Sequence, residues 1–375
     1  MAQYEDTAQP ARETSDRERK TLIVFVRGFR RPRGSAGLRD TVKPEALAYL
    51  GTRVEQPPQD LSLAGYAATR FGLVDGATVD IAEVDWEPRV GKLSTQPIIS
   101  RMLLGLILVC KGLSRAPLVW KSSLGLVLMS LVGFAVILAW LYLTASVLEG
   151  LAEKSLDSGA IATLKNVPGA VRNVVYGLHV FFEPRGLVYI AILAFVGILG
   201  ARGIDGDTFA DIADAFERYF NGGTAYGSLL EFRTVLVQQV FDAIGALTAN
   251  ARYDRVVVLG HSFGAIFASE AAARHGPPIE LITVGAFFNY LSVVNRTGAD
   301  KIVSDVVAAK IPWTDFSSPQ DYLTRVQVFR VASERFRPRS IPIPRASWSD
   351  RLFTQSHLYY FRCPEVNEAL FGRRG

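Results

Sequence analysis

The residues Gly260-His261-Ser262-Phe263-Gly264 place one serine between two glycines, in the pattern G-x-S-x-G. The apolar run Arg255–Leu259 leads directly into this pattern, and the alanine-rich run Phe263–Arg274 leads out of it. A strand, a sharp turn and a helix in this order hold a serine above the end of a sheet, where the turn requires small neighbours. A helix N-terminus favours developing negative charge, so Ser262 is a candidate nucleophile for attack on a carbonyl group. The alternative is an ordinary turn with a capping serine.

Four pieces of the sequence together resemble the α/β-hydrolase superfamily, in particular its lipases and esterases. They are Gly260–Gly264, Arg27-Gly28-Phe29, Asp321 and His357. The likeness extends from Thr21 to about Leu370, apart from an apolar region in the middle of the chain. It implies a mostly parallel sheet flanked by helices and a catalytic triad in the order serine, acid, histidine, without a metal or cofactor.

This order selects a candidate general base, which a serine needs because its hydroxyl is a poor nucleophile alone. Two histidines follow Ser262 in the chain. The turn Gly260–Gly264 is called the elbow below. His275 lies at the far end of the helix that begins at this elbow, which leaves His357 as the expected base. His261 stands on the elbow itself, and its place on the turn is expected to direct its ring away from Ser262.

The expected acid of the triad is Asp321, which would orient His357 and stabilise its imidazolium form. Asp321 follows the apolar segment Ile311–Phe316 and a turn, and the resemblance places the acid after a strand end. Asp315 is the alternative acid. Either residue could instead cap a turn, which is the commonest role of aspartate in such segments.

An oxyanion hole requires two backbone N–H groups close to the nucleophile. The resemblance implies one donor from Phe263, directly after the serine, and the other from Phe29, with Gly28 allowing the turn. Many relatives carry a histidine before this glycine, where the present chain has Arg27. That departure leaves the backbone donors unaffected, and a plain basic loop is the alternative interpretation.

Strand and helix patterns alternate along the rest of the chain, which predicts an α/β fold with a mostly parallel sheet covered on both faces. The expected strands are Thr21–Phe29, Ala77–Val84, Arg255–Leu259, Glu280–Val284, Ile311–Phe316 and Val326–Ala332. The expected helices are Leu61–Gly72, Thr208–Phe220, Ser228–Thr248 and Phe263–Arg274.

A membrane hairpin is expected in the middle of the chain. The segment Ser122–Leu148 contains no charged residue and exceeds the roughly 20 residues that cross a bilayer. Gly186–Ala201 is shorter, so a core or re-entrant helix is the alternative there. Segments on both sides are expected to share one domain, which requires an even number of crossings. Basic residues are more frequent on the hairpin's flanks than in its loop, which favours cytoplasmic termini.

The predicted organisation therefore has four parts. Residues 1–20 are polar, lack the apolar core of a signal peptide and are expected to form a disordered leader. Residues 21–100 form the first part of the α/β domain, and residues 101–202 the membrane insertion, with helices at about 122–148 and 186–201. Residues 203–375 form the second part and carry the candidate triad.

Composition narrows the classes of function. The 41 Lys and Arg against 36 Asp and Glu give a formal charge of +5, without the long basic stripe of a nucleic-acid-binding protein. The short basic clusters Arg27–Arg33 and Arg335–Arg345 suit a solvated surface or anionic lipid headgroups. Two cysteines and four histidines at their spacings suggest neither a zinc site nor a disulfide framework.

The expected function is that of a membrane-anchored serine hydrolase that cleaves lipid or other acyl esters through an acyl-enzyme. The lipid bilayer and an ester substrate are the expected partners, and the oligomeric state stays open. Two alternatives remain at this stage. One is a non-catalytic binding or assembly module on a hydrolase fold, and the other is an acyltransferase that uses the same triad.

Overall fold

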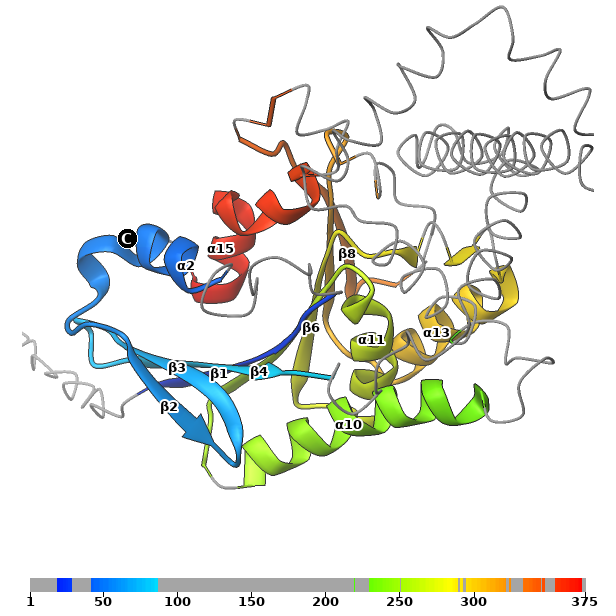
Figure 1. Ribbon diagram of the computed structural model, residues 1–375, viewed down its shortest axis with the longest axis horizontal. Helices are drawn as coiled ribbons and strands as arrows, with labels where there is room; N and C mark the ends of the chain where they lie inside the picture. Colours follow the sequence, from blue (N-terminus) through cyan, green and yellow to red (C-terminus); the bar gives the residue numbers. More distant parts are fainter. Residues whose placement is uncertain are drawn as a thin grey trace, which may run out of the picture.

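The described part of the chain contains eight strands, which form one sheet (Figure 1). The computed structural model describes residues 19–28, 42–86, 219, 229–249, 251–288, 291–292, 295–321, 324, 333–344, 346–347 and 355–372. The strands are β1 (Lys20–Val26), β2 (Gln59–Leu63), β3 (Tyr66–Gly72), β4 (Thr78–Val84), β5 (Arg255–His261), β6 (Ile279–Val284), β7 (Trp313–Ser317) and β8 (Phe336–Ser340). The described helices of two or more turns are α2 (Lys43–Leu50), α10 (Leu229–Ala249), α11 (Gly264–His275), α13 (Arg296–Ala308), α15 (Pro364–Phe371) and the 3₁₀ helix η4 (Gln355–Arg362).

The sheet has the order β2-β3-β4-β1-β5-β6-β7-β8. From β4 to β8 every neighbouring pair is parallel, whereas β2 and β3 pair antiparallel at one edge. The predicted α/β fold with a mostly parallel sheet is thereby confirmed. Since the carboxyl ends of parallel strands meet at one edge of the sheet, the segments after β1, β5, β6 and β7 come together there.

The central strand β1 is buried on both faces, which explains its unbroken apolar run. Leu22, Val24 and Val26 belong to the core on one face of the sheet. Ile23 and Phe25 belong to the core on the other face. Full burial of one such side chain contributes roughly 1.5–3 kcal/mol, so β1 is a main source of stability.

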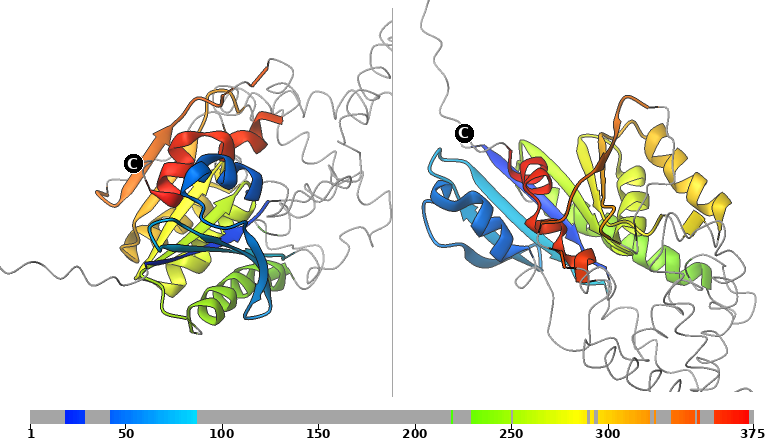
Figure 2. Two further views of the ribbon diagram at one scale, coloured as in Figure 1. Left: turned by 90° about the vertical axis from the view of Figure 1, so that its left-hand side faces the viewer. Right: turned by 90° about the horizontal axis from the view of Figure 1, so that it is seen from above.

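Helices cover both faces of this sheet. The α10, α11 and α13 helices pack against one face, and α2, α15 and η4 lie against the other (Figures 1 and 2). Segments far apart in sequence meet in the layer formed by α2, α15 and η4. There the Tyr49 hydroxyl of α2 donates to the Gly372 carbonyl after α15 at 2.9 Å. Arg362 also contacts Glu45 of α2 at 3.0 Å. The described segment from Arg362 to Gly372 therefore packs against α2.

Most predicted elements of the α/β domain are present. The strands β1, β4, β5, β6 and β7 and the helices α10 and α11 lie where apolar runs and helical periodicity predict them, within a few residues. The β8 strand and the helices α2, α13 and α15 were not predicted. The expected strand Val326–Ala332 lies outside the described residues, as does the expected helix Thr208–Phe220 except for Tyr219.

The predicted helix Leu61–Gly72 is wrong, because this segment forms the hairpin of β2 and β3. A two-residue turn joins the strands, with φ of +49° at Ala64 and +87° at Gly65. Positive φ at both central residues matches the twist of a hairpin and ends any helix. Leu61 and Leu63 then reach the core at a period of two residues instead of the helical period.

The two predicted membrane helices, at about 122–148 and 186–201, lie outside the described residues. Within the described ranges, no helix combines the length and the apolar character that crossing a bilayer requires.

Replacing Ala64 by Asn is expected to stabilise the protein. Ala64 has a left-handed backbone conformation that costs a typical L-residue about 1–2 kcal/mol, and Asn tolerates it better than Ala does. We expect the substitution Ala64→Asn to raise the free energy of unfolding by up to about 1 kcal/mol and the melting temperature by about 2–4 °C, measured by thermal unfolding.

Ala67→Asn is the matched control, because Ala67 is also exposed but lies within β3 opposite Ser62. Asn is unfavourable in strands, so this control gives no gain. Equal changes in the two variants would contradict the assignment of strain to the turn.

Candidate active site

Ser262 occupies a strained turn between β5 and α11. Its φ is +59°, a left-handed conformation that costs a non-glycine residue on the order of 1–3 kcal/mol. The Ser262 N–H donates to the Val284 carbonyl of β6 at 3.1 Å, and the Ser262 carbonyl accepts from Ala265 at 3.2 Å. The surrounding backbone therefore holds the serine in this conformation, between one strand and the first turn of the helix.

The glycines around Ser262 are required by close approach of backbone segments. A Cβ at Gly260 would lie 2.5 Å from Ala265 Cα, and a Cβ at Gly264 would lie 2.5 Å from the Val26 carbonyl oxygen. A Cβ at Gly28 would lie 2.6 Å from Ser262 Cβ and 2.9 Å from its Oγ. Any side chain at Gly28 would thus occupy the space of the serine hydroxyl.

His357 lies in η4 and forms a buried pair with Asp321. The distance from His357 Nδ1 to Asp321 Oδ2 is 2.7 Å, with 5% of the histidine and none of the aspartate exposed. Since Asp321 Oδ2 accepts from Nδ1–H, the Nε2 atom of a neutral His357 carries the lone pair. Nε2 is buried and has no hydrogen-bond partner in the described part of the chain. The imidazole therefore presents an unoccupied basic nitrogen.

Three donors converge on one oxygen of Asp321. Besides His357, the Thr324 hydroxyl donates to Oδ2 at 2.5 Å and the Tyr360 hydroxyl at 3.0 Å. Burial, and next the negative charge of Asp321, raise the pKa of Tyr360, so its hydroxyl stays protonated and able to donate. Such donors compensate a buried carboxylate for its lost water.

The alternative acid Asp315 has a different environment. It lies within β7, where its Oδ1 accepts from the Thr283 hydroxyl of β6 at 2.6 Å. Thr283 in turn accepts from the Trp313 indole N–H at 2.9 Å. Of the two candidate acids, Asp321 is thus the one whose carboxylate contacts the His357 imidazole.

Ser262 and His357 lie at the same end of two neighbouring strands. Val284, which accepts from the Ser262 N–H, is followed by Gly285. A Cβ at Gly285 would lie 2.9 Å from His357 Cε1 and 3.1 Å from its Nδ1, so this glycine makes room for the imidazole. The ring of His261, the residue before the serine, lies 5.0 Å from the His357 ring between centroids. Contacts on both sides of the elbow therefore bring the imidazole to the serine's end of the sheet.

His261 itself binds the main chain instead of a reacting group. Its Nε2 lies 3.1 Å from the His357 carbonyl oxygen, which can only accept, so Nε2–H is the donor. Burial, and next the neighbouring His357, lower the pKa of His261 to about 3. The neutral His261 ring thus connects the elbow to η4 through the hydrogen bond from its Nε2–H to the His357 carbonyl.

The expected oxyanion-hole donors are described only in part. Phe263 is fully buried and directly precedes α11, whose N-terminus therefore lies beside the serine. Phe29 lies outside the described residues, which end at Gly28 in this loop. A Cβ at Gly28 would nevertheless overlap with Ser262, so the described part of the loop lies beside this serine.

Three contributors to the site were not predicted: Thr324, Tyr360 and Gly285. Thr324 and Tyr360 each follow a predicted residue, Asp321 or His357, by three positions, which corresponds to one helical turn. That spacing is the signal in the sequence that could have identified them. Gly285 has φ of +54° and follows a strand, but nothing in its sequence context relates it to a histidine so distant in the chain.

Neither a protein-family model nor a curated protein matches this sequence in comparisons with known proteins. No group of three or more His, Cys, Asp or Glu residues that could hold a metal ion occurs within the described ranges. A strained serine, a carboxylate-bound imidazole and a helix N-terminus together can form and stabilise a tetrahedral oxyanion.

The buried His261 predicts a loss of stability in acid. Below its ordinary pKa of 6.5 the unfolded chain binds a proton at His261, whereas the folded chain does not until about pH 3. Protons therefore favour unfolding in this window, and the free energy of unfolding falls as the pH falls. The contribution of one such group is at most about 1.4 kcal/mol per pH unit.

Urea denaturation of wild type and His261→Gln across this window measures the effect. The glutamine amide can still donate to the His357 carbonyl but does not titrate. We expect the variant to lose stability less steeply than wild type as the pH falls. Parallel curves for the two proteins would contradict the assignment of a buried, neutral His261.

Proposed function

We propose that the chain is a serine hydrolase of the α/β-hydrolase type, which cleaves carboxylic esters through an acyl-enzyme on Ser262. One observation carries the proposal. A serine at φ +59° in a strand–turn–helix lies at the same sheet edge as a histidine whose Nδ1 is bound by a buried aspartate. Nucleophilic catalysis by serine requires this combination of a base whose nitrogen lone pair is not engaged in a hydrogen bond and a group that orients the base.

Each residue has a role in the proposed reaction. Ser262 Oγ attacks the ester carbonyl while His357 Nε2 accepts its proton, and Asp321 stabilises the resulting imidazolium. The Phe263 N–H, and in this proposal that of Phe29, stabilise the tetrahedral oxyanion. His357 returns the proton to the departing alcohol, which leaves an acyl group on Ser262. A water molecule, deprotonated by His357, then releases the carboxylic acid.

The surroundings of the triad favour an apolar acyl group. Only 6% of Ser262 and 5% of His357 are exposed. The ring of Phe287, which is only partly buried, packs on the imidazole at 5.3 Å between centroids. An aromatic ring beside the base binds hydrocarbon and excludes water, so we propose a lipid or another acylated molecule as the substrate.

Membrane anchoring is also part of the proposal, and it rests on the uncharged segment Ser122–Leu148. The pairing of β1 supports an even number of crossings. Both β4, which precedes this segment, and β5, which follows it, pair with β1 in one sheet. The two flanks of the segment must then lie on the same side of a membrane, and the basic residues near them favour the cytoplasmic side.

Fluorophosphonate labelling of the protein in membranes tests the proposal, with Ser262→Ala as the comparison. We expect labelling of wild type and none of the variant, because the probe reacts only with an activated serine. The labelled protein is expected to stay in the membrane pellet after an alkaline carbonate wash. In sealed vesicles of known orientation, protease on the cytoplasmic side is expected to remove the label.

Absence of labelling in folded wild type would overturn the hydrolase assignment and favour a binding module. Product analysis with a competing alcohol separates a hydrolase from an acyltransferase, because only the latter forms the new ester in preference to the free acid. Release of labelled protein by the carbonate wash would contradict membrane anchoring alone.

The two candidate acids provide a second test. Asp321→Asn removes the carboxylate that orients His357, and we expect kcat for ester hydrolysis to fall by about 10³- to 10⁴-fold. Asp315→Asn is the matched control, because this buried residue retains an oxygen for the Thr283 hydroxyl. We expect kcat of the control to stay within about threefold of wild type. A larger loss in Asp315→Asn than in Asp321→Asn would reverse the assignment.

A further inference from the structure

Three aromatic rings surround Phe263, the residue directly after the proposed nucleophile. Its ring lies edge-on to Tyr219 at 5.4 Å, to Phe267 at 5.5 Å and to Trp86 at 6.0 Å between centroids. The side chains of Phe263, Phe267 and Trp86 are at most 1% exposed, and that of Tyr219 is 2% exposed. Edge-on rings in such contact leave Phe263 little freedom to turn or shift. Its backbone N–H is therefore held by the packing of its side chain.

Trp86 also fixes the other side of the serine. Its indole N–H donates to the Arg27 carbonyl at 2.9 Å. Arg27 is followed by Gly28, which contacts Ser262. The Arg27 guanidinium is itself buried and pairs with Asp85 at 2.5 Å, next to Trp86 in the chain. One indole ring thus contacts the side chain of Phe263, directly after the serine, and the backbone carbonyl of Arg27, directly before Gly28.

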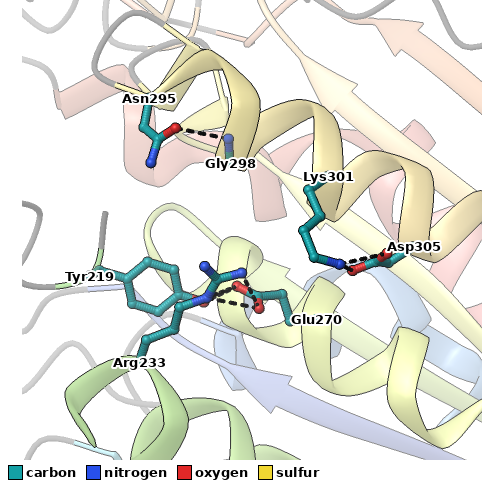
Figure 3. Close-up of polar contacts among 7 residues, drawn as sticks. All are labelled: Tyr219, Arg233, Glu270, Asn295, Gly298, Lys301 and Asp305. Atoms are coloured by element: carbon teal, nitrogen blue, oxygen red, sulfur yellow. Dashed lines mark hydrogen bonds and ion pairs between the residues drawn. The ribbon is translucent and has the colours of Figure 1, made fainter. Parts of the chain in front are cut away.

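The Tyr219 side chain contacts a partly buried ion pair between Glu270 of α11 and Arg233 of α10 (Figure 3). Its hydroxyl donates to Glu270 at 2.5 Å, and Arg233 binds the same carboxylate through two nitrogens, at 2.6 Å and 3.0 Å from Oε2. The Arg233 guanidinium also lies 5.6 Å from the centre of the Tyr219 ring. The buried Tyr219 ring therefore contacts both the Arg233 guanidinium and the ring of Phe263.

We propose that Trp86 and Tyr219 are positioning residues for the oxyanion hole of Ser262, acting through the ring of Phe263 and the carbonyl of Arg27. This inference rests on the proposed function. An oxyanion hole is effective only when its N–H groups are preorganised, and misplacement by about 1 Å can cost about a hundredfold in rate. In sequence, Trp86 and Tyr219 lie on opposite sides of residues 101–202. The chain before and after the predicted membrane insertion is thereby joined to the residue that follows the nucleophile.

A merely structural role for Trp86 would lower stability without a specific effect on the transition state. Trp86→Phe is therefore compared with Trp313→Phe. Trp313 is equally buried, and its indole N–H donates one hydrogen bond, to Thr283, as that of Trp86 does to Arg27. Its ring packs on Phe288 and Phe336 instead of Phe263. In both variants a single phenyl ring replaces the two fused rings of the indole, and the hydrogen bond of the indole N–H is lost.

Steady-state hydrolysis of a p-nitrophenyl ester, inhibition by a trifluoromethyl ketone and thermal unfolding are measured for both variants. The ketone forms a tetrahedral adduct with serine and so reports on oxyanion stabilisation. For Trp86→Phe we expect kcat to fall about tenfold and the ketone to bind weaker by a similar factor, with KM within about twofold of wild type. For Trp313→Phe we expect a comparable change of melting temperature but kcat and ketone affinity within about twofold.

Tyr219 is tested by its ring and its hydroxyl separately. Tyr219→Phe keeps the ring on Phe263 and is expected to retain kcat within about threefold, whereas Tyr219→Leu is expected to lose about tenfold. Retention of kcat in Tyr219→Leu, or an equal loss in Tyr219→Phe, would overturn the role of the ring.

Failure of this inference is distinguishable from failure of the proposed function. Equal losses of kcat in Trp86→Phe and Trp313→Phe, with an active wild type that Ser262→Ala inactivates, overturn only the positioning role. Wild type that hydrolyses no ester and takes up no fluorophosphonate overturns both. A selective loss of kcat and ketone affinity in Trp86→Phe supports both.

Discussion

The close approach of three backbone segments at Ser262 is the constraint on which the rest of the site depends. The end of β1, the turn after β5 and the start of α11 meet where Gly28, Gly260 and Gly264 leave no room for a Cβ. A serine at positive φ costs on the order of 1–3 kcal/mol, which the buried sheet on both sides has to offset. The hydrogen bond from Ser262 to Val284 then ties the turn to β6, whose continuation accommodates the imidazole.

A second dependence runs from the carboxylate of Asp321 to the end of the chain. Asp321 is fully buried and its carboxylate would be costly to bury without hydrogen-bond donors, and η4 provides two of them, His357 and Tyr360. The 3₁₀ helix is in turn fastened to the elbow by His261. The helix α15 follows directly and packs on α2 and on the hydrophobic core of the sheet face that contains Ile23 and Phe25. Packing of the last residues of the fold therefore determines whether the histidine stands at the serine.

The sequence predicts well those parts of the fold that local patterns determine. Continuous apolar runs identify β1, β5 and β6, and helical periodicity identifies α10. A proline at the start and a glycine after the end of α2 and of α15 are signals of helix boundaries in the sequence. Each helix has only eight residues, which is too short for a clear helical periodicity. The β8 strand, FRPRS, buries only Phe336 and contains a proline, so neither apolar pattern nor propensity reveals it. The sequence alone also cannot decide which aspartate contacts His357, because Asp321 and Asp315 both lie near the end of β7. The tertiary fold makes this choice.

The order of the sheet has a consequence for biosynthesis. The β1 strand pairs on one side with β4, which is translated soon after it, and on the other side with β5, which is translated only after the entire apolar middle of the chain. While a nascent chain passes this stage, one edge of the apolar strand β1 has no neighbour. Open edges of that kind invite association with other chains. Correct folding during synthesis is therefore favoured by conditions that protect the open edge of β1 until β5 has emerged from the ribosome. A bound chaperone, or a wide separation of nascent chains from one another, would provide this protection.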